Sequence, residues 1–331
     1  MRSAAIFLCA EVNSEAKGRA INKRHTVRLV GERARGARIA GSVLREITDV
    51  LLDATRGSVR QRVEGRSTTR GSVPAWLQSA ADFELVGLEA GSTLLIIEAP
   101  ALLDVAPSLF SQRELFEPID AMNSAFGLME ETLALAADGR SDSELFDQQL
   151  LSTFRRFDRI LSFGFSSIEL TNGDARRQPV VIDAGAIKAV DGLIRSTPAP
   201  QTARVSGRLD TIRHSDRMFT LLLDDGKAAK GIADGLAAEQ LAGLFGQSVV
   251  VSGTAVFRAS GVLLRIEAEA IEPAGSDVEV WARAPVPLFQ VMDAASLRQP
   301  QGPRSGVNAV MGRWPGEETD EEIAVALREL S

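Results

Sequence analysis

The sequence predicts an α+β N-terminal domain, an all-β five-stranded barrel and a short C-terminal helical tail. Three observations support this fold class. Residues 203–273 contain short or alternating apolar runs typical of five strands, with one helical pattern before the fourth. Residues 112–162 carry two apolar stripes at helical spacing, and strand patterns lie on either side of them. Residues 312–331 combine an aromatic anchor, a turn and a short amphipathic helix.

The barrel prediction rests on turn residues and on the order of elements. Asp224-Asp225-Gly226 predicts a hairpin turn, and Gly246 predicts the left-handed end of the short helix. Three strands, one helix and two strands is the order of the OB fold, whose second and third strands often bind oligonucleotides or oligosaccharides. Gly207 and Gly253 lie inside strands, where a small barrel bends strongly. We therefore expect an OB-like barrel over residues 203–273.

The barrel leaves two binding functions open. Single-strand binders combine basic grooves with exposed aromatic side chains for stacking, but Phe219 and Phe257 lie among apolar neighbours that indicate core positions. The other reading is a structural or protein-binding barrel. The candidate nucleic-acid-binding residues are Arg204, Arg208, Arg213, Arg217, Lys227 and Arg258.

Composition narrows the class of protein. The chain has 331 residues, of which 45% are hydrophobic and 24% charged, as expected of a globular protein with two or three domains. The single Cys9 excludes an internal disulfide and a multi-cysteine zinc site, in keeping with a cytoplasmic location. No apolar run reaches the length of a membrane helix, so we expect no membrane partner.

Charge is unevenly distributed along the chain. Residues 1–75 contain 15 Lys and Arg against 7 Asp and Glu, whereas the remainder is acidic and brings the net charge to −7. The basic part is either a phosphate-facing patch or a face that pairs with acidic residues of the same chain or of a second copy. A homo-oligomer is therefore left open.

The N-terminal domain is predicted over residues 1–196. A strand at 25–30 and a helix from Ile39 to about Thr55 precede a polar loop, Gly57–Pro74. The loop is basic and glycine-flanked, as an anion cradle requires, but it lacks the spacing of a phosphate-binding loop before a helix. The candidate anion-binding residues are Arg66, Ser67, Thr68, Thr69 and Arg70.

The rest of this domain reads as an antiparallel sheet with a pair of long helices. We expect a hairpin over residues 83–98, helices over 112–137 and 142–162, and further strands at 166–171 and 180–182. Ser141 is the expected N-cap of the second helix. A helix over 184–194 and the linker 197–202 follow. Helical period places most acidic residues of the helix pair on outer faces: Asp120, Glu130, Glu131, Asp138, Asp142 and Asp147.

Catalytic signatures are absent from the sequence. The two histidines, His25 and His214, fall in different predicted domains and lack metal-ligand spacing. No motif singles out a nucleophilic serine or threonine. The sequence thus favours a non-enzymatic protein with no cofactor, no metal and no assigned catalytic residue.

The C-terminal part consists of a predicted linker, 274–311, and a docking tail, 312–331. Trp314-Pro315-Gly316 forms an aromatic anchor and a turn, and Thr319 with Glu322 forms a capping box. Such a short helix is marginal in isolation and needs a groove to bind. The predicted partner-binding residues are Trp314, Pro315, Gly316, Ile323, Leu327 and Leu330.

This tail resembles the C-terminal tails of small bacterial antitoxin-like proteins and of proteins encoded beside such systems. The resemblance covers about twenty residues, and the large body in front departs from any small antitoxin. The N-terminal domain with its OB-like barrel also resembles uncharacterised bacterial proteins. The resemblance implies that Trp314, Pro315, Gly316, Ile323 and Leu327 contact a protein partner.

Three functions follow in order of preference. The favoured one is protein–protein binding, in which the tail docks a toxin or defence effector. The first alternative is single-stranded nucleic-acid binding by the barrel and the basic N-terminal region. The second alternative is a nucleotide-binding enzyme in the N-terminal domain, centred on the loop at residues 66–70.

Overall fold

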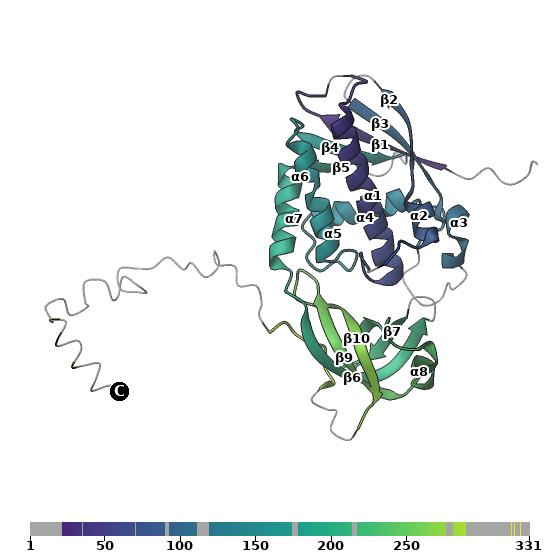
Figure 1. Cartoon of the computed structure of the whole chain (residues 1–331), viewed down its shortest axis with the longest axis vertical. Coiled ribbons are helices and arrows are strands. Elements are labelled where there is room, and N and C mark those ends of the chain that lie inside the picture. Colours follow the sequence, from purple (N-terminus) through teal and green to yellow (C-terminus); the bar gives the residue numbers. More distant parts are fainter. Residues whose placement is uncertain are drawn as a thin grey trace, which may run out of the picture. The chain divides into compact units, whose positions relative to one another are not determined.

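A computed structural model describes residues 22–34, 36–69, 71–89, 93–110, 119–173, 178–213, 217–275 and 281–288, together with 319, 321 and 325. The described residues up to 288 belong to one compact unit. They form an α+β domain followed by a closed five-stranded barrel (Figure 1).

The N-terminal sheet is antiparallel, as the sequence predicts. Its five strands lie in the order β2-β3-β1-β4-β5. Strand β3 lies between two neighbours and is buried over most of its length, as its continuous apolar run indicates. The strands are β1 (Asn22–Val30), β2 (Glu84–Glu89), β3 (Thr93–Pro100), β4 (Ser167–Asn172) and β5 (Val180–Asp183).

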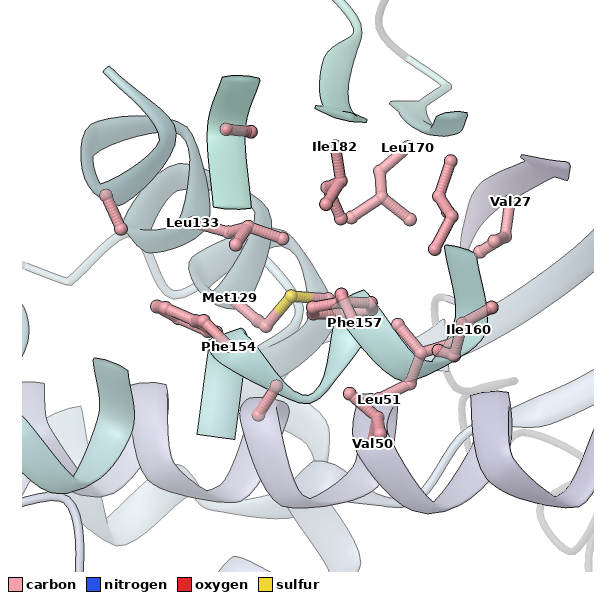
Figure 2. Packing of buried hydrophobic residues seen from close by; sticks show 14 of the residues in the cluster. Val27, Val50, Leu51, Met129, Leu133, Phe154, Phe157, Ile160, Leu170 and Ile182 are labelled. Atoms are coloured by element: carbon pink, nitrogen blue, oxygen red, sulfur yellow. The ribbon is translucent and has the colours of Figure 1, made fainter. Parts of the chain in front are cut away.

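Helices pack on the sheet and form the main core with it. Figure 2 shows Phe154 and Phe157 among side chains from α1 and α4 and from strands of the sheet. Because these aromatic side chains are fully buried, they contribute strongly to the hydrophobic stabilisation of the domain. The helices are α1 (Gly41–Glu64), α2 (Ala75–Ala81), α3 (Leu102–Val105), α4 (Ala125–Ala137), α5 (Gln148–Arg155), α6 (Phe157–Leu161) and α7 (Ala184–Ser196), with a 3₁₀ turn η1 (Pro107–Phe110).

Several predicted helix boundaries were wrong, and the single helix expected over 142–162 consists of two helices, α5 and α6. Helix α1 continues to Glu64, well beyond the expected end, so the predicted loop begins only at Gly65, which has a left-handed φ of 70°. Helix α4 begins after Ser124, whose side chain accepts a hydrogen bond from the Gly127 N–H. Helix α5 begins after Asp147 rather than after Ser141. Ser124 and Asp147 belong to the residue types that favour the N-cap position, and each caps the helix that follows it.

The barrel contains the predicted elements in the predicted order. Its strands close in the order β10-β8-β7-β6-β9, with β8 and β10 parallel and the other neighbours antiparallel. The elements are β6 (Gln201–Arg213), β7 (Met218–Leu222), β8 (Ala228–Ile232), α8 (Ala238–Gly243), β9 (Ser248–Phe257) and β10 (Leu263–Pro273).

The core positions expected for Phe219 and Phe257 are confirmed, and the two strand glycines lie where neighbouring backbones approach closely. Phe219 and Phe257 are buried, whereas Phe245 is 60% exposed. A Cβ atom at Gly207 would lie 2.8 Å from the Leu222 carbonyl oxygen, and one at Gly253 would lie still closer to a backbone carbonyl. Both glycines therefore permit close approach of neighbouring strands.

The start of the predicted C-terminal linker is held on the barrel. The Gln201 side chain donates from Nε2 to the Val286 carbonyl (2.9 Å) and accepts from the Leu288 N–H (3.1 Å). Ala284 packs against the barrel core. Gln201, the first residue of β6, thus holds the backbone of residues 286–288 beside the barrel.

We predict that Gly253→Ala destabilises the protein, because the added Cβ would lie 2.1 Å from the Glu267 carbonyl oxygen. The free energy of unfolding should fall by about 1–3 kcal/mol, the usual cost of overpacking. Gly192→Ala is the control, since that position in α7 faces open space and alanine should stabilise the helix by about 0.5–1 kcal/mol. Urea unfolding measures both, and an unchanged midpoint for Gly253→Ala would contradict the prediction.

Candidate functional site

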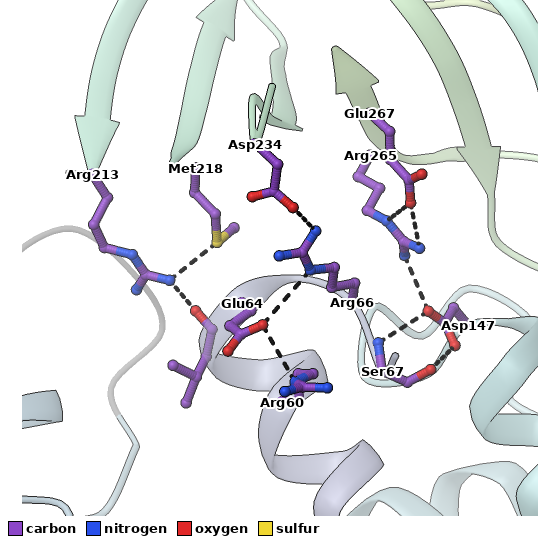
Figure 3. A network of polar contacts seen from close by, with 11 residues as sticks. Arg60, Glu64, Arg66, Ser67, Asp147, Arg213, Met218, Asp234, Arg265 and Glu267 are labelled. Atoms are coloured by element: carbon purple, nitrogen blue, oxygen red, sulfur yellow. Dashed lines mark hydrogen bonds and ion pairs between the residues drawn. The ribbon is translucent and has the colours of Figure 1, made fainter. Parts of the chain in front are cut away.

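The candidate site lies where the C-terminal half of α1, the loop after it and the start of α5 meet the barrel. Figure 3 shows the polar network that joins these elements. Its partners come from distant parts of the chain, since Arg66 and Asp234 lie 168 residues apart in the sequence. Two cavities flank the loop, of about 580 Å³ on the barrel side and about 280 Å³ against α1 and α5.

Asp147 is the centre of this network. Its carboxylate caps α5 by accepting from the Leu150 N–H (3.1 Å), and it also accepts from the Ser67 N–H (3.2 Å) and Ser67 Oγ (2.5 Å). Arg265 of β10 donates to the same carboxylate at 3.2 Å and to Glu267 at 3.0 Å. Because Asp147 and Arg265 are only 4% and 8% exposed, each charge needs the opposite charge to offset the free-energy cost of removing it from water. The expectation of a solvated Asp147 was wrong.

The loop predicted to cradle an anion holds one from its own chain. Ser67, which is buried, uses its N–H and hydroxyl to bind the Asp147 carboxylate. Thr68 and Thr69 line both cavities. Arg70 lies outside the described residues. Among the predicted anion-binding residues, Ser67 therefore fixes the loop in place. Thr68 and Thr69 are left facing the two cavities.

Arg66 of this loop is bound by two carboxylates. It donates from Nη1 to Asp234, and its Nε lies 3.6 Å from Glu64 Oε2. Burial would lower the pKa of Arg66, but the hydrogen bond and charge of Asp234, with Glu64 and Glu267, raise it above its usual value. Arg66 therefore stays charged and links the end of α1 to the barrel.

The last turns of α1 contain buried polar atoms without hydrogen-bond partners among the described residues. Arg60 is 6% exposed, and its Nε lies 3.3 Å from Glu64 Oε2 without the geometry of a hydrogen bond. Its Nη2 is buried with no acceptor. The hydroxyls of Thr55 and Ser58 and the Oε1 of Gln61 are also buried without a hydrogen-bond partner among the described residues. Such groups normally find protein, water or ion partners, which marks this half-helix as unusual.

Glu144 makes a second link between the α+β domain and the barrel. It accepts from Lys230 of β8 (2.6 Å) and from Arg258 (2.5 Å), and the Gln61 amide donates to its backbone carbonyl (2.9 Å). Partial burial would raise the pKa of Glu144, but the hydrogen bonds and charges of Lys230 and Arg258 lower it below its usual value of 4.5. Arg258 also donates to the Asp142 carbonyl at 2.9 Å.

Groups of the chain itself bind Arg213, Arg217 and Arg258, three of the predicted nucleic-acid-binding residues. Besides Arg258, two of them bind backbone carbonyls of the chain, since Arg213 donates to Val63 and Arg217 to Leu236. Arg213 therefore ties the end of β6 to α1. The remaining three predicted cations are exposed on the barrel: Arg204, Arg208 and Lys227.

Sequence reasoning missed a buried serine–histidine–glutamate arrangement. His25 Nε2 lies 2.8 Å from Ser124 Oγ, and its Nδ1 lies 3.2 Å from both carboxylate oxygens of Glu130. The Ser124 hydroxyl also accepts from the Gly127 N–H at 3.0 Å, so Ser124 is best placed to donate to His25, which donates to Glu130. The three side chains are buried, with exposures of 2%, 0% and 5%, and we assign the arrangement to joining β1 to α4. The expectation of an outward-facing Glu130 was wrong.

Several expected features fall outside the described residues. His214 is one of them. Glu321 and Val325, two described residues of the tail, are helical and exposed. The predicted partner contacts Trp314, Pro315, Gly316, Ile323, Leu327 and Leu330 are also outside the described part of the chain.

Two properties of the described residues and three comparisons with known proteins bear on function. In the part of the chain that the structure describes, no three or more His, Cys, Asp or Glu side chains group in a way that could hold a metal ion. Over the same residues, no helix combines the length and apolarity needed to span a membrane. Searches of family models, curated proteins and solved structures found nothing that matches this chain.

We predict that Asp147→Ala lowers the free energy of unfolding by about 3–5 kcal/mol, the usual result of removing one partner from a buried ion pair. The matched control is Asp183→Ala, because Asp183 caps α7 through the Ala186 N–H but is exposed; its expected cost is about 1 kcal/mol. Urea unfolding of both variants measures the difference. Equal losses would show that Asp147 matters only as a helix cap.

We also predict that the contribution of Glu144 to stability disappears in acid. Because its folded pKa lies below the usual 4.5, its stabilising effect is complete above that value and is lost as the pH falls through the lower, folded-state pKa. Glu144→Gln should therefore be less stable than the wild type at pH 7, with the gap closing below about pH 4. Thermal unfolding across this range measures the gap, and Glu272→Gln, an exposed position on β10, serves as control. A gap independent of pH would exclude this effect.

Proposed function

We propose that this protein is a non-enzymatic cytoplasmic binding protein that docks a partner protein through its C-terminal part. The observation that carries the proposal is the segment around Val286 and Leu288. Their side chains are 76% and 78% exposed, although both backbone positions are fixed by Gln201. Apolar side chains on a backbone that is already ordered bind with a smaller loss of conformational entropy.

The barrel supports this segment, and we propose that it is an OB fold. Its strand order, the parallel pairing of β8 with β10 and the position of α8 between β8 and β9 support that assignment. Three of its cations, Lys230, Arg258 and Arg265, bind carboxylates of the α+β domain. These contacts favour a barrel used for protein contacts over one that tracks a phosphate backbone.

The tail indicates the class of partner. Its resemblance to antitoxin-like tails favours a toxin or defence effector. In this proposal, the partner contacts begin at Val286 and Leu288 and continue to Trp314. The apolar ridge of Ile323, Leu327 and Leu330 would then enter a groove on the partner.

A second candidate function is single-stranded nucleic-acid binding on the outer side of β6. Arg204 and Arg208 are four residues apart on this strand and both exposed. Phe245 is exposed and precedes Gly246, whose N–H donates to the Leu209 carbonyl beside Arg208. One aromatic ring and two cations would give weak, strongly salt-dependent binding.

We predict that the double variant Val286→Asp, Leu288→Asp loses the partner that the full-length protein captures from its host. The loss should be about 30-fold or more in affinity once the partner is purified, as for hot-spot residues. Trp314→Ala should have the same effect if the tail takes part. Affinity capture with mass spectrometry identifies the protein, and titration with the purified partner measures the affinity.

The control is Val181→Asp, an apolar position on β5 of the α+β domain that is 45% exposed. It should leave capture unchanged. Sequencing of nucleic acid in the same eluates tests the second candidate, with Arg208→Glu as its variant. Identical captured proteins from the wild type and the double variant would refute docking through this segment, and nucleic acid lost with Arg208→Glu would favour the second candidate.

A further inference from the structure

The cavity of about 280 Å³ between α1, α5 and the loop after α1 lies entirely within the α+β domain. Arg56 and Arg60 line it from α1, and Thr68 and Thr69 line it from the loop. None of these side chains takes part in the proposed partner docking. The cavity is therefore separate from the proposed docking segment.

Arg60 is the first sign that the cavity binds an anion. Its guanidinium is more than nine-tenths buried, yet its Nη2 has no hydrogen-bond acceptor among the described residues. Glu64 offsets its charge from the Nε side at 3.3 Å. A buried donor on a charged group is costly to leave unpaired, and an oxyanion in the adjoining cavity would supply the missing acceptor.

Arg56 provides a second cation one helical turn before Arg60. Its Nε is also buried without a hydrogen-bond partner, and its Nη1 lies 3.8 Å from Asp53 Oδ1. Asp53 is the carboxylate in the cavity wall that would repel an anion, but Arg156 donates to its other oxygen at 2.5 Å. Among the side chains that line the cavity, two guanidinium groups face one carboxylate, Asp53, so the balance of charge in the lining is positive.

The loop adds hydroxyl donors in a fixed position. Ser67 is held by Asp147, which anchors the backbone immediately before Thr68 and Thr69. Guanidinium groups with neighbouring hydroxyls match the geometry of a phosphate group, which accepts several hydrogen bonds at once. The buried side chains of Leu77 and Leu150 form an apolar part of the wall.

We propose that this cavity binds a phosphate group, either as inorganic phosphate or at the end of a small organic phosphate, between the guanidinium groups of Arg56 and Arg60. The cavity is larger than a phosphate group alone needs, and its apolar wall can contact a small organic part. In this site Arg60 Nη2 and the hydroxyls of Thr68 and Thr69 donate to the phosphate oxygens.

The test is calorimetric titration of the full-length protein, in buffer free of phosphate and sulfate, with inorganic phosphate and separately with a nucleoside 5′-monophosphate. We expect saturable binding of at least one. Arg56→Gln should weaken it about 10- to 100-fold, the usual worth of a hydrogen bond to a charged group. Tighter binding of the monophosphate would identify an organic phosphate as the ligand, and equal binding would identify phosphate itself.

Arg155→Gln is the matched control, because Arg155 lies on α5, pairs with Asp191 at 2.9 Å and is exposed. Arg60→Met should abolish binding; if it fails to fold, Arg56→Gln decides. Absence of saturable binding by both ligands overturns the proposal. Equal weakening by Arg155→Gln also overturns it, because the effect would then be general attraction to a positive surface.

Discussion

The junction between the two folded parts depends on the buried carboxylate of Asp147. A charge that is 4% exposed must be matched by donors, and these come from the start of α5, from Ser67 and from Arg265 of β10. One side chain thereby ties a helix start, a loop and a barrel strand together. The positions of both flanking cavities follow from where this carboxylate holds the loop.

Pairing of opposite charges also accounts for other contacts between the α+β domain and the barrel. The sequence has a basic front and an acidic remainder, and the structure pairs the two in part, as when Arg66 binds Asp234 of the barrel. In the opposite sense, Glu144 of the α+β domain binds Lys230 and Arg258 of the barrel. Cations bound in this way are less available to a phosphate backbone. Arg56 and Arg60, which line a cavity within the α+β domain, are better placed to bind a small anion.

Sequence patterns worked where one periodicity dominated and failed where a polar residue was buried. The antiparallel sheet and the five barrel strands were predicted because apolar alternation and turn glycines agree there. The residues from Gly57 to Pro74 predict a loop because they are rich in glycine, arginine and hydroxyl side chains, yet α1 continues through them to Glu64. In the folded protein, Val59 and Val63 of this segment pack in a second buried apolar cluster, which stabilises the longer helix. Ser141 is the expected N-cap because it follows the predicted break between the two helices, whereas the helix begins after Asp147, another residue type that favours the N-cap position.

The sequence by itself determined the kinds of element and their order, since backbone propensity and side-chain period act over a few neighbouring residues. It also determined the uneven charge and the turn glycines. Only the tertiary structure decided which acidic residues are buried, because Asp147 meets Arg265, and Glu130 meets His25, across more than 100 residues of chain. Helical period alone placed both carboxylates outside; contact with a distant partner made it possible for them to lie inside.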